Sequence, residues 1–115
     1  MGSISEKDSQ ELEIILKYCK RIGKALEAFG ERYETFKHNV VFQDACSLSI
    51  IQIGEAVNRL SDKFVESHPQ IEWHNIYGMR CRLVHAYDMF DAEIVWDAIM
   101  TYVPVLQNFC EETTI

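Results

Sequence analysis

The chain has 115 residues, a formal net charge of −7 and a hydrophobic fraction of 48%. This length fits a single domain, 1–115, and the apolar content is enough for a packed core, which excludes a disordered chain. Glycine and proline are scarce, with five and two residues, so long helices are expected rather than a sheet with many turns. From the sequence we expect no apolar run of membrane-span length and no signal peptide, and therefore a cytoplasmic protein without membrane contact.

The negative charge is unevenly distributed along the chain. Residues 86–115 carry six acidic residues and no basic one, whereas residues 70–85 carry Glu72 against Arg80 and Arg82. A general electrostatic attraction for nucleic acid is therefore not expected, but a small cationic site remains compatible with the sequence. The acidic end is interpreted as a solvated face, with docking of a basic partner surface as the alternative.

The first predicted elements are two long helices. Apolar residues recur every three or four positions from Leu12 to Phe29, which predicts an amphipathic helix that ends at Gly30. Residues 1–7 are expected to form a flexible N-terminus. A connection over 31–38, with a short helical turn, leads to a second long helix over about 39–60.

The second half of the chain also favours helices. Ser61-Asp62 is expected to begin a shorter helix that ends at Pro69, and the next helix begins near Trp73. Asp91 is expected to cap a last helix, which Pro104 should kink or divide. Since strand-like alternation is absent, the predicted fold is all-α, an antiparallel bundle of four to five helices.

The cysteines indicate reduced thiols rather than disulfides. They form no Cys-x-x-Cys pair, and each falls in a predicted helix: Cys19, Cys46, Cys81 and Cys110. His74, Cys81 and His85 could be drawn as metal ligands, but a fourth ligand and the usual spacing are missing. No metal and no cofactor are therefore expected.

The segment 80–87 carries the most informative chemistry. It brings together Arg80, Arg82, His85 and Tyr87 within an otherwise acidic chain. A guanidinium binds phosphate through a fixed fork of donors, and an imidazole moves protons near neutral pH. This combination indicates chemistry on a phosphodiester, most plausibly RNA. Each residue also has a structural alternative: a surface arginine, a histidine at a helix end, and a tyrosine in a core or an interface.

Helix geometry constrains how these residues work together. At about 100° per residue, Arg80 and His85 point about 140° apart, whereas Arg82 and His85 share a face. Three routes would join Arg80 to His85: the helix loosens near His85, the long arginine side chain reaches around, or two motifs meet across a two-fold dimer axis.

The spacing of Arg80, His85 and Tyr87 resembles the R-x(4–6)-H-x-Y motif of HepT-type toxins, which belong to the HEPN superfamily of helical ribonucleases. The similarity extends over roughly residues 8–112. Besides the motif, the similarity rests on residues 52–61, 68–69, 73, 76–80 and 90–96. The resemblance implies an HEPN-like bundle that forms a two-fold homodimer.

The resemblance also implies a function, the ribonuclease toxin of a type VII toxin–antitoxin system that cleaves RNA without a metal. His85 would be the acid and base, Arg80 would bind phosphate and stabilise the transition state, and Arg82 would hold the RNA backbone. Two proton transfers are needed, and a dimer supplies two copies of His85. Tyr87 would be the residue on which a partner nucleotidyltransferase (MNT-type) antitoxin places AMP, which silences the enzyme.

Two residues near Arg80 bear on this expectation. Cys81 stands where HEPN ribonucleases usually place a polar residue, often Asn, and a thiol is a poor hydrogen-bonding substitute. Glu55 is a candidate to pair with Arg80, with an exposed helix glutamate as the alternative. The alternative function is therefore a catalytically weak or inactive HEPN binding module that is the partner and substrate of a nucleotidyltransferase.

Overall fold

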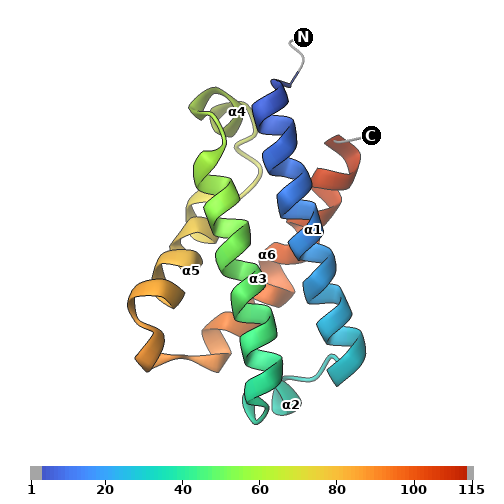
Figure 1. Cartoon of the computed structure of the whole chain (residues 1–115), viewed down its shortest axis with the longest axis vertical. Helices are drawn as coiled ribbons and strands as arrows, with labels where there is room; N and C mark the ends of the chain where they lie inside the picture. The colour runs from blue at the N-terminus through green and yellow to red at the C-terminus, as the bar shows by residue number, and fades with distance from the viewer. Residues whose placement is uncertain (1–3, 114–115) are drawn as a thin grey trace.

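The computed structural model describes residues 4–113, with the Tyr87 side chain left out, and folds them into a helical bundle (Figure 1). Its four long helices are α1 (Glu6–Phe29), α3 (Val40–Arg59), α5 (Trp73–His85) and α6 (Ala92–Thr113). The connections contain α2 (Tyr33–Lys37), α4 (Asp62–Ser67) and the 3-10 turn η1 (Tyr87–Met89). Successive long helices run in opposite directions. The predicted all-α antiparallel bundle is confirmed, with two short helices beside the four long ones.

Short polar side chains begin four of the helices, because each accepts a hydrogen bond from a backbone N–H that has no partner within the helix. These caps are Ser5 for α1, Asn39 for α3, Ser61 for α4 and Asp91 for α6. Gly30 ends α1 with φ 95°, a conformation that L side chains rarely adopt. The predicted boundaries at Gly30, Ser61 and Asp91 are therefore confirmed.

Two local predictions need correction. Glu6 and Lys7 belong to α1, so the flexible N-terminus predicted over 1–7 does not include them, and residues 1–3 lie outside the described part. Of the two outcomes predicted for Pro104, division of the last helix is wrong, because α6 continues through it to Thr113. Val103 and Leu106 on either side are buried in the core, and this packing holds the helix together across the missing hydrogen bond.

The central helix α3 is more apolar than the sequence analysis allowed. Over 18 residues its mean hydropathy is 1.3, so by length and composition it reaches the size of a membrane span. Half of that window is buried, and α3 packs against both α1 and α5. These contacts identify α3 as the central helix of the bundle, and its buried apolar residues pack against the neighbouring helices.

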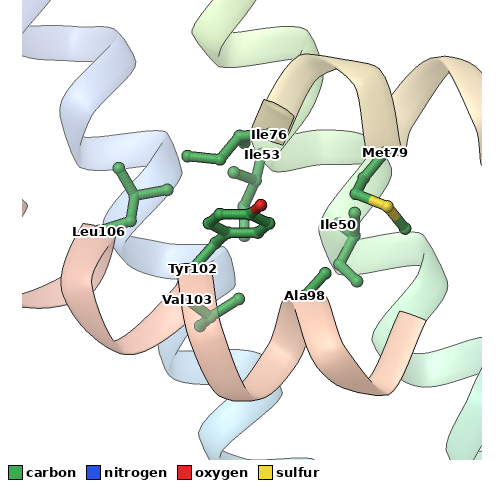
Figure 2. A pocket seen from close by; sticks show the side chains of 8 residues that line it. All are labelled: Ile50, Ile53, Ile76, Met79, Ala98, Tyr102, Val103 and Leu106. Atoms are coloured by element: carbon green, nitrogen blue, oxygen red, sulfur yellow. The ribbon is translucent and has the colours of Figure 1, made fainter. Parts of the chain in front are cut away.

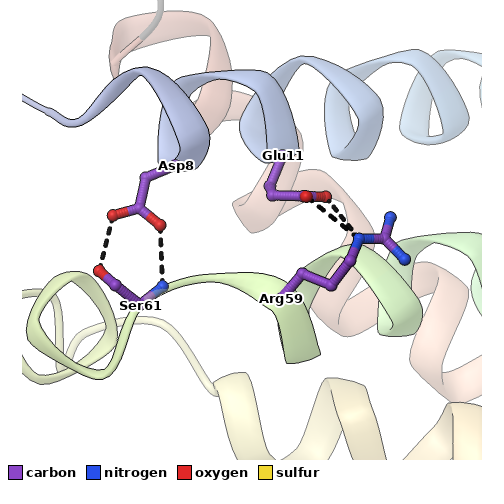
Figure 3. Close-up of polar contacts among 4 residues, drawn as sticks. All are labelled: Asp8, Glu11, Arg59 and Ser61. Atoms are coloured by element: carbon purple, nitrogen blue, oxygen red, sulfur yellow. Dashed lines mark hydrogen bonds and ion pairs between the residues drawn. The ribbon is translucent and has the colours of Figure 1, made fainter.

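Two polar contacts join the first turns of α1 to the end of α3 (Figure 3). Asp8 accepts hydrogen bonds from the Ser61 backbone N–H at 2.8 Å and from the Ser61 hydroxyl at 2.6 Å. Glu11 forms an ion pair with Arg59, whose Nε lies 3.0 Å from Oε1. Burial acts to raise the pKa of Asp8, but the hydrogen bonds from Ser61 outweigh it, and the pKa falls below the usual 3.8.

A small apolar cavity of about 20 Å³ lies where α3, α5 and α6 meet (Figure 2). Side chains from all three helices converge on it, among them Ile53, Ile76 and Tyr102. A space of this volume holds about one water molecule, and apolar walls offer such a molecule little hydrogen bonding. The cavity is therefore a packing defect of the core and not a substrate site.

All four cysteines are thiols rather than disulfides, as predicted. Three of them are buried, at positions 19, 46 and 110, and burial raises the pKa of Cys46 and of Cys110 to about 12. The pKa of Cys19 is raised further for the same reason. Cys81 alone is partly exposed, and it lies beside the motif arginine.

Candidate active site

The helix α5 carries the motif and packs along α3 (Figure 1). Arg80 lies on the side that faces α3, and His85 is the exposed last residue of α5. The helix is regular to its end, because the Ala86 N–H donates to the Arg82 carbonyl at 2.9 Å. The structure therefore excludes the first of the three predicted routes, a helix that loosens near His85.

Glu55 of α3 holds the guanidinium of Arg80. Arg80 Nε lies 2.8 Å from Glu55 Oε1 as an ion pair, although its N–H is not aligned for a hydrogen bond, and Nη2 donates to Oε2 at 3.3 Å. The hydrogen bond that Arg80 donates to Glu55 raises the pKa of Arg80 above its usual value. The Arg80 side chain keeps 19% of its surface exposed. The arginine is thus charged and held along one edge by Glu55.

Gly54 allows α3 and α5 to approach closely at Arg80. A Cβ atom at position 54 would overlap the Cβ of Arg80 and would lie 2.9 Å from its Cγ. The sequence analysis did not identify Gly54 as a site residue, although a signal was present. Glycine inside a helix costs about 1 kcal/mol relative to alanine, so a glycine in an apolar helix indicates a close contact.

Two further side chains of α5 flank the guanidinium. Arg80 Cζ lies 5.7 Å from the centre of the Tyr77 ring, in cation–π range, and Nη1 lies 3.9 Å from Cys81 Sγ. A hydrogen bond with Cys81 raises the pKa of Tyr77. Cys81 therefore contacts the guanidinium from the position at which a polar residue was expected, but its sulfur is a weak acceptor.

The structure separates Arg82 from Arg80. Arg82 is exposed and lines a groove of about 330 Å³ between α5 and α6, together with His74 and Asp97. Since residues two apart on a helix point about 200° from each other, this groove lies away from the Glu55 pair. The groove has a basic wall on α5 and an acidic residue on α6.

Tyr87 lies directly after the motif helix. Its backbone begins η1, two residues beyond His85, and its side chain lies outside the part of the chain that the structure describes. Within residues 4–113, no three His, Cys, Asp or Glu side chains are placed to hold a metal ion, so His74, Cys81 and His85 do not form a ligand set.

The motif helix places its guanidinium and its imidazole on different faces. A fixed cation faces α3, and a single exposed imidazole lies at the end of the same helix, about 140° around its axis. The guanidinium is suited to bind a phosphate, and the imidazole is suited to transfer a proton. A reaction with two proton transfers needs a second acid or base beside them.

Comparisons with known proteins identify the family. Residues 11–113 match the family model described as "Ribonuclease HepT-like". "Putative RNase TTE0752" of Caldanaerobacter subterraneus subsp. tengcongensis is 34% identical over 101 residues, which cover 88% of this chain and 88% of that protein. "Probable ribonuclease HepT" of Thermococcus cleftensis is 28% identical over 104 residues, 83% of this chain and 91% of that protein. No solved structure gives a significant match. This chain belongs to the HepT-like ribonuclease family of HEPN proteins.

Proposed function

We propose that this protein is a metal-independent RNA endonuclease of the cytoplasm and the toxin of a type VII toxin–antitoxin system. The observation that carries the proposal is the ion pair between Glu55 of α3 and Arg80 of α5. Arg80 is held by Glu55 through two contacts, is seated against Gly54, and keeps 19% of its side chain exposed. A guanidinium that is fixed in this way but still reachable from solvent, five residues before an exposed histidine, supports a role in binding phosphate.

The proposed reaction uses only side chains of the motif. Arg80 binds the scissile phosphate and stabilises the charge that develops on the phosphorane. One His85 removes the proton of the 2′-hydroxyl, whose oxygen attacks phosphorus, and a second His85 protonates the 5′-oxygen that leaves. The products are a 2′,3′-cyclic phosphate and a 5′-hydroxyl, and no metal ion takes part in this route.

A homodimer would supply the second histidine. The faces of α3 and α5 that surround the Glu55–Arg80 pair are apolar and partly uncovered, with Leu48 55% exposed and Val84 43% exposed. Helical spacing places Leu48 on the same side of α3 as Glu55, and Val84 on the same side of α5 as Arg80. An apolar surface of this kind favours contact with a second copy. We therefore propose that the two chains pair through these faces.

Arg82 and Tyr87 complete the proposal. Arg82 holds the RNA backbone at the groove between α5 and α6, outside the reacting centre. Tyr87 is the residue on which a nucleotidyltransferase antitoxin places AMP, and the added phosphate blocks the site beside His85. Peptide mapping by mass spectrometry after co-expression with such a partner should find AMP on Tyr87, and the Tyr87→Phe variant should remain unmodified. AMP on another residue would contradict this assignment.

A second function is favoured by one specific contact. The Cys81 sulfur lies 3.9 Å from the guanidinium, where a polar side chain would hold Arg80 or the phosphate more firmly. In that case the chain is a weak or inactive HEPN module that serves as the partner and substrate of the nucleotidyltransferase. Cys81→Asn should then raise cleavage above the wild-type level.

Ribonuclease activity in EDTA tests the proposed function. Purified wild-type protein, confirmed by mass to carry no AMP, is incubated with total RNA next to His85→Ala and His38→Ala. His38 is exposed at the end of α2, away from the motif helix, so His38→Ala controls for the loss of a surface imidazole. Cleavage should be lost only in His85→Ala. Absence of cleavage by wild type would favour the inactive module, and cleavage that requires added Mg²⁺ would contradict the metal-free route.

A further inference from the structure

A second hollow lies between α2 and the first half of α6. Figure 1 shows α2 and the start of α6 at the same end of the molecule, and the two helices are in contact. The hollow has a volume of about 480 Å³ and is lined by Tyr33, Glu93, Trp96, Asp97 and Met100. Asp97 also borders the groove that contains Arg82, and none of the five residues belongs to the reacting centre proposed above.

The aromatic walls of this hollow are held in place from behind. The Trp96 ring packs against Phe36 at 5.2 Å between ring centres, and edge-to-face against Phe42 at 6.1 Å. Tyr33 lies 6.2 Å from Trp96 with the two rings tilted by 55°. Because both partners behind Trp96 are fully buried, the indole is fixed before any ligand arrives.

The carboxylates of the hollow have no cation of their own. Glu93 and Asp97 are exposed, and neither forms an ion pair with another described residue. The cation–π contacts found within residues 4–113 reach Tyr18 and Tyr77, so neither Tyr33 nor Trp96 is occupied in this way. Residues 86–115 contain no basic residue that would compensate the acids.

Two fixed aromatic rings beside two carboxylates are complementary to a planar cation. We propose that this hollow binds an arginine side chain presented by a basic segment of a protein partner. The guanidinium stacks on the Trp96 ring and lies beside the Tyr33 ring, which is tilted by 55° against Trp96, and its N–H groups donate to Glu93 and Asp97. A lysine has the charge but not the planar fork, and the acidic walls repel nucleic acid. This inference is independent of the ribonuclease activity.

Nuclear magnetic resonance of the ¹⁵N-labelled full chain tests the proposal with a hexa-arginine peptide as the probe. The protein has two indole N–H signals, and Trp73, which is buried and donates to the His68 carbonyl, is an internal reference for Trp96. The Trp96 signal should shift and saturate as the peptide is added, while the Trp73 signal stays in place. A Trp96 signal that does not move would overturn the proposal.

Charge-matched variants separate this pocket from general attraction to an acidic protein. Glu93→Gln with Asp97→Asn should weaken peptide binding about tenfold, because two ion pairs and their support of the stacked cation are lost. Glu111→Gln with Glu112→Gln removes the same charge from exposed positions of the same helix and should change binding by less than about twofold. Equal weakening in both variants would show attraction by net charge alone.

Two further comparisons address the rings and the chemistry of the cation. Tyr33→Ala, which leaves every charge in place, should weaken binding of the arginine peptide several-fold. A hexa-lysine peptide should bind more weakly than hexa-arginine, and equally tight binding of the two would overturn the assignment to arginine. The dispersion of the amide signals reports whether each variant remains folded.

Discussion

Replacement of Gly54 by alanine tests whether close contact between α3 and α5 positions the site. At an uncrowded helix position, this change stabilises a protein by about 1 kcal/mol. At position 54 the new methyl group would overlap the Cβ of Arg80, an atom next to the backbone that no rotation of the arginine side chain can move away. Overpacking of this kind costs about 1–3 kcal/mol, so the helices must separate.

The other helical glycines provide matched controls. A Cβ at Gly23 of α1 or at Gly78 of α5 would meet no atom within 4 Å. Urea unfolding followed by circular dichroism should therefore place Gly54→Ala about 1–3 kcal/mol below Gly23→Ala in stability. In a domain of this size the melting temperatures should differ by about 4 °C for each kcal/mol.

The rate of RNA cleavage provides a second measurement on the same variants. Because a shift of α5 away from α3 moves Arg80 relative to Glu55, RNA cleavage should fall in Gly54→Ala and remain unchanged in Gly23→Ala. If Gly54→Ala is as stable and as active as Gly23→Ala, the contact is not tight and the argument for Gly54 fails.

Three other predictions follow from the polar contacts and the thiols. Glu55→Gln should leave the fold intact but lower the initial rate of RNA cleavage by up to about 100-fold, because Arg80 loses its ion pair. An unchanged rate would show that Glu55 does not position Arg80. The pKa of Asp8 is lower in the folded than in the unfolded chain, so its contribution to stability is present above pH 3.8 and is lost as the pH falls through the folded pKa. Asp8→Asn should therefore lower the melting temperature at neutral pH and much less in strong acid, and an equal loss at both would contradict the assignment. A thiol reagent should modify only Cys81 rapidly in the native protein, since the other three cysteines are buried; rapid reaction of all four would show that the bundle opens easily.

The local signals in the sequence predicted most of the fold. Helix boundaries at Gly30, Ser61 and Asp91 depend on capping by the residue itself, so a single position is enough to predict each of them. The continuity of α6 through Pro104 depends instead on burial of its neighbours, which the sequence does not display. The role of α3 was also not predictable from its composition. Its apolar residues fit a membrane span as well as a core helix, and only the fold shows that α1 and α5 pack against it.

The site was predictable where it is contained in one helix. The angle between Arg80 and His85 follows from their spacing, and the structure keeps it because α5 is regular to its end. The contact with Glu55, 25 positions earlier in the chain, was a candidate among alternatives until α3 and α5 were seen together. The hollow between α2 and α6 joins Tyr33 to Trp96 over a still longer separation, and no spacing pattern indicates it.

A heterodimer with one functional histidine tests the central claim, a ribonuclease site shared by two chains, most directly. Wild-type and His85→Ala chains with different affinity tags are co-expressed, and the mixed dimer is purified through both tags. If each reaction needs two copies of His85, the mixed dimer should cleave RNA no faster than the His85→Ala homodimer. Cleavage at about half of the wild-type rate would show that each chain has a complete site of its own and would contradict the account.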